Sequence, residues 1–380
     1  MLSVREYQKI FPADVPNFDE LCKFAEAHDY LSLSWRYVQA KNYVGVIRLP
    51  SGFRIEILPK LDAPAEKLRG LVVEMLRTLK DFAGKEFRAA ALDTARLDLY
   101  EIFIRAYLEM VAELVKRGLK SSYVVREDNL NFFTGKLLVA ANLRKNFVHR
   151  EKFFVAFDEH SLNRAEHRLI KSTLARLLRT TRNPKNFRLA TRLLADFDAV
   201  PPSKNFAADI ASLKRDKLTC AYEVIMAWTK IFLRGESFTS FAGATQTQAL
   251  LFPMERLFEA FVAAHVKKIF SDRFSVRTQV RENFLFDAPN NACMLKPDIL
   301  LENSAEKIIL DTKWKFEPSP ADMYQMFAYG KRYGARKIFL LCPIGDAAAD
   351  KNFYSTADDL SVTIFHVDPF DAATSISKIF

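Results

Sequence analysis

Two aspartates and a lysine in the last third of the chain have the types and spacing for shared chemistry. Pro297-Asp298 is followed, after twelve residues, by Asp311-Thr312-Lys313, the only Asp/Glu-x-Lys of the sequence. This triplet ends an apolar run. Burying a charged side chain in such a run is unfavourable unless the charge is paired or binds a metal. Carboxylate oxygens suit Mg²⁺, and a metal-bound water beside a lysine can hydrolyse a phosphodiester. The alternative is an ion pair on an exposed edge strand.

Two apolar strands, residues 298–301 and 307–313, are expected to position these groups, because a short polar turn joins them. Side chains alternate faces along a strand, so Asp311 and Lys313 should point to one side, and Thr312 to the other. Asp298 begins the neighbouring strand of the predicted hairpin and can approach Asp311. The two carboxylates and the ammonium group are therefore expected to meet at one strand end.

Two predicted helices add candidate residues. Ser319-Pro320-Ala321-Asp322 has the pattern of a capping box that opens a helix over residues 320–333. Gln325 and Tyr329 lie four residues apart on one face of it and could hydrogen-bond a phosphate or a carboxylate. The same pair could equally belong to a partly buried helix face.

Glu259 lies within the apolar sequence of another predicted helix, over residues 253–269. A carboxylate in such a place is a candidate third metal ligand. The competing interpretation is a salt-bridged acid of the core.

Composition limits the class of protein. The chain has 380 residues, a formal net charge of +10 and 49% apolar residues, which excludes wholesale disorder and predicts two or three domains. No apolar stretch approaches the length of a membrane span, and no signal-peptide pattern opens the sequence. The four cysteines form no CxxC pair, so we expect buried, reduced thiols in a cytoplasmic protein.

The order of the predicted elements indicates an α+β protein. Residues 1–90 are expected to form a β-rich domain with a hairpin of strands 43–49 and 54–58. Residues 91–240 read as mainly helical, with a strand pair near 123–125 and 135–139. Residues 241–380 alternate helices and strands as an α/β domain does.

The middle region carries a basic segment. Nine Lys and Arg residues lie between Arg164 and Arg192, interleaved with apolar residues at helical spacing. The pattern predicts a helix with one buried and one basic face, suited to DNA or to a partner protein. A basic face that only aids solubility is the alternative.

The pattern of Asp298, Asp311 and Lys313 resembles the PD-(D/E)XK nuclease superfamily, and Gln325-x-x-x-Tyr329 resembles the QxxxY motif of its RecB-like branch. Most of the chain also resembles the McrC family, the nuclease subunits of McrBC-type modification-dependent restriction systems. The stretches that carry this resemblance are 42–47, 55–60, 135–137, 143–146, 157–161, 250–254, 257–259 and 322–326.

The resemblance implies an antiviral endonuclease that cuts DNA with Mg²⁺, or with Mn²⁺ in its place. Asp298, Asp311 and Glu259 would hold the metal, Lys313 would be the catalytic lysine, and Gln325 and Tyr329 would support the site. It also implies an AAA+ GTPase of the McrB type as partner, with residues 1–90 docking to its ring and stimulating GTP hydrolysis. The chain itself has no G-x-x-x-x-G-K-[ST] for GTP.

Two other functions remain open. A stand-alone RecB-like repair or defence nuclease would not need residues 1–240. A non-catalytic adaptor that activates an AAA+ ring would not need Asp298, Asp311 and Lys313 together.

Overall fold

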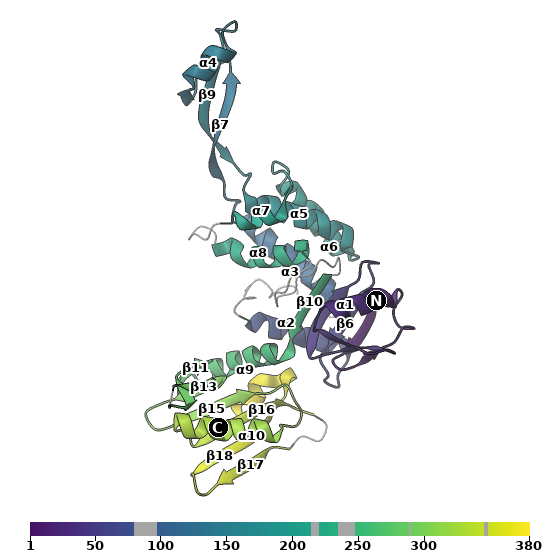
Figure 1. Ribbon diagram of the computed structural model, residues 1–380, viewed down its shortest axis with the longest axis vertical. Coiled ribbons are helices and arrows are strands. Elements are labelled where there is room, and N and C mark those ends of the chain that lie inside the picture. Colours follow the sequence, from purple (N-terminus) through teal and green to yellow (C-terminus); the bar gives the residue numbers. More distant parts are fainter. Residues whose placement is uncertain (80–96, 214–219, 235–247, 289, 346–348) are drawn as a thin grey trace. The chain divides into compact units, whose positions relative to one another are not determined.

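The computed structural model describes residues 1–79, 97–213, 220–234, 248–288, 290–345 and 349–380 (Figure 1). The chain divides into two compact units. We call Met1–Tyr100 together with Gly235–Phe380 the composite unit, and Glu101–Arg234 the middle unit. Helices and strands are both abundant in the described residues, so the predicted α+β class is confirmed. The division at residues 90 and 240 stays a prediction.

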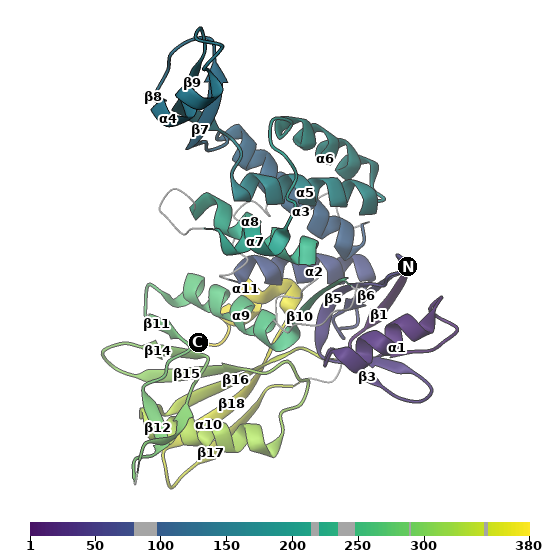
Figure 2. The same cartoon turned by 45° about the horizontal axis from the view of Figure 1, so that its top comes forward.

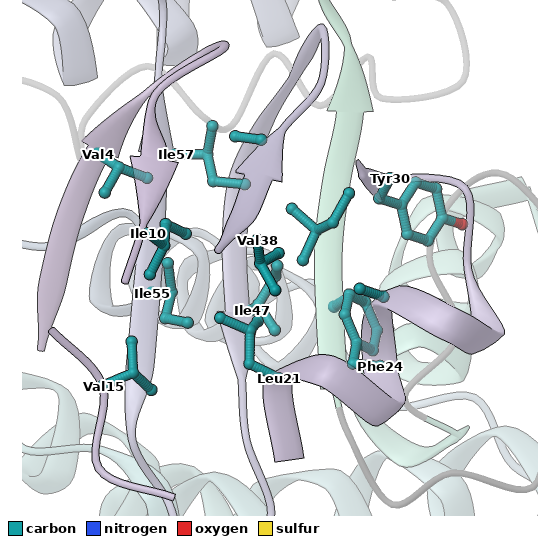
Figure 3. Packing of buried hydrophobic residues seen from close by; sticks show 14 of the residues in the cluster. Val4, Ile10, Val15, Leu21, Phe24, Tyr30, Val38, Ile47, Ile55 and Ile57 are labelled. Atoms are coloured by element: carbon teal, nitrogen blue, oxygen red, sulfur yellow. The ribbon is translucent and has the colours of Figure 1, made fainter. Parts of the chain in front are cut away.

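The first part of the composite unit contains two small sheets with the orders β1-β6-β5-β10 and β2-β4-β3. The predicted hairpin is confirmed as the antiparallel pair β5–β6. Figure 3 shows how apolar side chains of these strands and of α1 pack together, among them Val4, Ile47, Ile55 and Phe24. The elements are β1 (Leu2–Arg5), β2 (Lys9–Ile10), α1 (Phe18–Ala27), β3 (Leu31–Leu33), β4 (Val38–Ala40), β5 (Tyr43–Arg48), β6 (Arg54–Leu58) and α2 (Ala65–Thr78).

A strand from much later in the chain completes the first sheet. β10 (Gln248–Pro253) runs antiparallel to β5 and places Leu251 opposite Gly45. A Cβ at Gly45 would lie 1.8 Å from the carbonyl oxygen of Leu250, and the φ of Gly45 is 136°. Only glycine allows so close an approach. The sheet of the first hundred residues therefore depends on residues 248–253.

The C-terminal part is a six-stranded sheet with the order β11-β14-β15-β16-β18-β17. The central strands β15, β16 and β18 are parallel, and the remaining neighbours are antiparallel. Figure 2 shows α9 and α11 on one side of this sheet and α10 on the other. The elements are α9 (Met254–Phe270), β11 (Ser275–Thr278), β12 (Asn283–Phe286), β13 (Ala292–Leu295), β14 (Ile299–Glu302), β15 (Lys307–Thr312), α10 (Pro320–Tyr333), β16 (Lys337–Pro343), β17 (Lys351–Ser355), β18 (Leu360–Val367), a 3₁₀ turn (Pro369–Asp371) and α11 (Ala372–Ser377).

The middle unit combines helices with a three-stranded sheet of the order β7-β9-β8. Figure 1 shows β7 and β9 as a long ribbon that carries α4 at its far end; we call residues 122–161 the arm. The elements are α3 (Leu99–Lys116, whose first two residues belong to the composite unit), β7 (Ser122–Leu130), β8 (Lys136–Leu137), α4 (Val139–Lys145), β9 (Phe153–Ser161), α5 (Ala165–Thr180), α6 (Pro184–Asp196), α7 (Phe206–Ala211) and α8 (Cys220–Arg234).

Two expectations for the middle unit are wrong. The strands near 123–125 and 135–139 do not pair with each other, because β9 lies between them and takes nine residues of β7 as its partners. The basic segment is not one helix. α5 ends at Thr180 and α6 begins at Pro184, since proline disfavours a helical residue before it and the side chain of Asn183 caps the new helix.

The cysteines differ in exposure. Cys342 is buried and Cys22 is half-buried, but Cys293 is exposed, so the expectation of buried thiols is wrong there. Cys293 lies in β13, which pairs with β12 in a two-stranded sheet, and three of the four residues of β13 are exposed. Among the described residues, no helix has both the length and the apolarity to cross a membrane.

Candidate active site

The hairpin β14–β15 brings the two aspartates together. Ile299 pairs with Leu310, so Asp298 and Asp311 occupy the next positions outward on the two strands. Asp311 is 1% exposed, and Asp298 is half-buried. The predicted convergence of the two carboxylates follows directly from this register.

Lys313 joins the pair as predicted. Its Nζ donates a hydrogen bond to Asp311 Oδ2 at 2.7 Å, which places both side chains on one side of the strand end. Its backbone N–H donates to the carbonyl oxygen of Leu341 at 2.9 Å, so the main chain at Lys313 is tied to β16. Burial by itself lowers the pKa of Lys313, but the charge of Asp311 and the hydrogen bond to it outweigh that effect, and the pKa is raised.

Asp311 is strongly perturbed by its surroundings. Burial, followed by the negative charge of Asp298, raises its pKa from 3.8 to about 7. The charge of Lys313 acts in the opposite direction and limits the shift. The site thus concentrates more negative charge than a single lysine offsets, which is the electrostatic condition of a cation site.

Sequence reasoning placed Thr312 on the side of the strand away from Asp311 and Lys313 and gave it no part in the site, but its side chain contacts Asp298. Its backbone N–H and its Oγ1 both donate to Asp298 Oδ2, at 2.8 and 2.7 Å. The two bonds fix the orientation of the Asp298 carboxylate. The only signal in the sequence is the position of a hydroxyl residue between Asp311 and Lys313.

Helix α10 contributes Gln325 and Tyr329. The predicted capping box of Ser319 and Asp322 is present at its start. Gln325 Nε2 donates to Tyr329 Oη at 2.9 Å, and Tyr329 Oη donates to the carbonyl oxygen of Lys296 at 3.1 Å. Burial, then the charges of Asp311 and Asp298, raise the pKa of Tyr329. The pair therefore supports the backbone two residues before Asp298.

Glu259 lies at the margin of the site. Its pKa is raised by burial and then by the charge of Asp298, so the two carboxylates are neighbours. Gln279 holds it: the Gln279 side chain donates to Glu259 Oε1, and the Gln279 backbone N–H donates to the carbonyl oxygen of Asp298 at 2.8 Å. Gln279 has a φ of 55°, which is uncommon for a residue other than glycine. Sequence reasoning missed Gln279.

The donor set fits a magnesium ion that completes its shell with other ligands. Within the described ranges, no three His, Cys, Asp or Glu side chains form a ready metal cluster, so Glu259 is not gathered with both aspartates. Asp298 and Asp311 remain as a close acidic pair. Mg²⁺ is commonly held by one or two carboxylates together with waters and substrate phosphates.

A cavity of about 1000 Å³ in the composite unit does not contain this acidic pair. Its wall includes Lys60, Phe316, Tyr324 and Phe353, and the first residues of α10 contribute to it. The acidic pair therefore lies at a strand end, outside this cavity.

Fold and site together define an α+β protein with an acidic pair and a lysine held at the end of one β-hairpin. Residues 38–343 match the model of a family described as McrBC 5-methylcytosine restriction system component. The match covers most of the 380 residues, and the chain belongs to this family. Comparison with curated proteins gives no match.

Two solved structures resemble the chain in fold. One is a refined half-complex from a tetradecameric assembly of Thermococcus gammatolerans McrB AAA+ hexamers with bound McrC; the similarity has a TM-score of 0.76 and 18% identity over 100% of both chains. The other is the Thermococcus gammatolerans McrBC complex, with a TM-score of 0.55 and 19% identity over 75% of this chain and 89% of that chain. At these identities the likeness concerns the fold.

Proposed function

We propose that this chain is the metal-dependent DNA endonuclease subunit of a cytoplasmic, GTP-driven restriction complex of the McrBC type. One observation carries the proposal: Asp298 and Asp311 face each other at the end of a hairpin, with Lys313 bonded to Asp311 at 2.7 Å. Membership of the restriction family supports DNA as the substrate. The arrangement has the hairpin acids and lysine expected of a PD-(D/E)XK nuclease.

Each residue of the site has a distinct role in this proposal. Asp298 and Asp311 hold Mg²⁺, or Mn²⁺, which supplies Lewis acidity and a more acidic water when bound. Lys313 offers a positive charge that stabilises the negative charge developing on the scissile phosphate. Thr312 orients Asp298, while Gln325 and Tyr329 support the chain that leads to it.

We place the partner contact on the arm, whereas the family resemblance alone placed it in residues 1–90. The arm carries large apolar side chains in water; Phe147, Val148 and Tyr123 are 77%, 80% and 76% exposed. Such exposure is typical of a surface that another protein covers. The similar half-complex contains McrB AAA+ hexamers with bound McrC, and we propose an AAA+ GTPase of the same type as the partner here.

The test is cleavage of plasmid DNA with Mg²⁺, comparing wild type with Lys313→Ala. Each protein is assayed alone and with its AAA+ partner and GTP, on methylated and unmethylated DNA. We expect cutting by wild type only, on methylated DNA and with both partner and GTP. Lys313→Ala should still stimulate GTP hydrolysis, because the arm lies in the middle unit and Lys313 in the composite unit.

The other outcomes select the remaining functions. Cutting by wild type without any partner would indicate a stand-alone nuclease. Stimulated GTP hydrolysis with no cutting under any condition would indicate a non-catalytic adaptor, and the nuclease assignment would then be wrong.

A further inference from the structure

Trp314, the residue directly after Lys313, is held by residues from the start of the chain. Its side chain is 3% exposed, and its indole Nε1 donates to the carboxylate of Glu6, at 2.9 Å to Oε2 and 3.2 Å to Oε1. Its carbonyl oxygen accepts a hydrogen bond from Lys60 Nζ at 2.8 Å. Both the side chain and the main chain of Trp314 are therefore fixed. We call Glu6, Lys60 and Trp314 the clamp.

Strand geometry explains why Glu6 and Lys60 lie side by side. β1 and β6 are parallel with Arg5 opposite Leu58, so the residues that follow them leave the sheet at the same edge. The backbone N–H of Glu6 donates to the carbonyl oxygen of Leu58 at 2.9 Å, and that of Lys60 donates to Glu6 Oε2 at 3.1 Å. Glu6 is thus rigidly placed before it meets Trp314.

Because these groups are buried, loss of their hydrogen bonds would lower the stability of the fold. Glu6 is 4% exposed, and a buried carboxylate left without a hydrogen-bond partner costs folding free energy. On its other side, the Trp314 ring packs against Phe258 of α9 with centroids 5.1 Å apart, next to Glu259. The clamp therefore joins the first sheet, the end of β15 and the helix that carries Glu259.

We infer that Glu6 and Lys60 are positioning residues for the proposed cleavage, because they act through Trp314 to fix the main chain from which Lys313 reaches Asp311. The inference rests on the proposed nuclease function. The hydrogen bonds of the clamp join Glu6, Lys60 and Trp314 to one another, and none of these bonds ends on Asp298, Asp311 or Lys313. Lys313 is held on one side by β16 through Leu341 and on the other by the clamp.

The experiment compares Glu6→Ala with Glu6→Gln in the full chain, using the plasmid assay with partner, GTP and Mg²⁺. Glu6→Ala removes the acceptor of Trp314, and we expect kcat to fall about 10- to 100-fold with KM unchanged, since small displacements of reacting groups have effects of this size. Glu6→Gln keeps an oxygen acceptor, and we expect it to restore most of kcat.

A second substitution covers the case in which Glu6→Ala does not fold. Trp314→Phe keeps an aromatic ring against Phe258 but removes the indole donor together with part of the ring volume, so it should lower kcat at least as much. Glu6→Ala and Trp314→Phe combined should lower kcat little more than either alone, because both remove the contact between Trp314 Nε1 and the Glu6 carboxylate. Stimulation of GTP hydrolysis and DNA affinity should remain at the wild-type level.

The matched control is Ser3→Ala. Ser3 lies on β1 and donates to Glu56 at 3.0 Å, so the change removes a hydrogen bond of the same sheet without touching the clamp. Its kcat should equal that of wild type. Wild-type kcat in both Glu6→Ala and Trp314→Phe would overturn the positioning role alone. Failure of wild type to cut at all would overturn the nuclease function, and this role with it.

Discussion

Thr312 and Asp298 are joined by two hydrogen bonds that end on one oxygen, from Thr312 N at 2.8 Å and from Thr312 Oγ1 at 2.7 Å. The backbone bond forms with any residue at position 312 except proline. The hydroxyl bond, in contrast, depends on a serine or threonine. The orientation of Asp298 is therefore open to test through a single side-chain atom.

Thr312→Val removes this hydroxyl with little change of shape. We expect slower cleavage and a higher Mg²⁺ requirement, because Asp298 loses one of the two bonds that orient it. The unfolding free energy should fall by about 1.5–3 kcal/mol, the usual value for a hydrogen bond to a charged group. Thr312→Ser keeps the donor and serves as the control. Equal Mg²⁺ dependence in the valine and serine variants would contradict the role given to Thr312.

Binding of Mg²⁺ should stabilise the chain, since the ion relieves the repulsion between Asp298 and Asp311. At a concentration one hundred times its Kd, Mg²⁺ should add about 2.7 kcal/mol, seen as a rise of the melting temperature. Asp311→Asn should abolish the rise. Asp358→Asn is the control, because it removes a carboxylate that pairs with Lys331 outside the site. A rise that persists in Asp311→Asn would place the metal elsewhere.

Glu6 gives a pH dependence of stability. Burial raises its pKa from 4.5 to about 7, so the folded chain binds its proton more tightly than the unfolded chain does. The stability from this group is full below pH 4.5 and is lost as the pH rises to about 7. Wild type should therefore lose about 3 kcal/mol relative to Glu6→Gln between pH 4.5 and 8. Urea unfolding of both proteins at several pH values measures the difference, and a constant difference would refute the shift.

The basic segment provides a test of DNA binding. Of its nine cationic residues, Arg168 pairs with Asp209 and Lys171 bonds the backbone, whereas Arg188 and Arg192 are exposed on α6. If α6 contacts DNA phosphates, changing both exposed arginines to alanine should reduce the slope of log affinity against log salt by about two.

The matched control for this test is Lys116→Ala with Arg117→Ala. It removes the same charge from two exposed residues near the end of α3 that both pair with Glu113. Its salt slope should equal that of wild type. Identical salt slopes for the two double variants would show that the basic face of α6 does not contact DNA phosphates and is only solvated.

Gly45→Ala should disrupt the pairing of β10 with β5. The new Cβ would collide with the carbonyl oxygen of Leu250, and alanine is strained at a φ of 136°. We expect a loss of about 2 kcal/mol or more in urea unfolding. Gly70→Ala is the control: among the described residues, nothing beyond the nearby backbone of α2 itself lies within 4 Å of a Cβ at this position, and a gain of up to about 1 kcal/mol is expected there. Equal stability of the two variants would contradict the role of Gly45.

The local part of the site was predictable because a hairpin is governed by short-range rules. The alternation of side chains and the turn at 302–306 suffice to bring Asp298, Asp311 and Lys313 together. The contact of Thr312 with Asp298 was not predicted, because it lies at the strand end, where the regular alternation of side chains no longer decides which of them meet. The contacts of Gln279 with Glu259 and of Glu6 with Trp314 were not predicted either. Each comes from the end of a strand distant in sequence, and no local pattern links those positions.

Long-range pairing was the part of the fold that the sequence could not reveal. The apolar run of β10 precedes a helix directly, and periodicity does not distinguish a short buried strand from the start of a helix. β9 was not predicted as a strand, and the partners of β7 and β8 were therefore wrong. The break between α5 and α6 was visible as Asn183-Pro184, yet the count of charges across it suggested one continuous face.

The return of β10 to β5 also bears on biosynthesis. Gln248 pairs with Arg48, so the two partners lie 200 positions apart in the chain. During that interval β5 would leave the ribosome with a bare edge, and an unpaired edge is a template for wrong association between chains. We therefore expect the nascent chain to need a chaperone, or to fold slowly, until β10 has been synthesised.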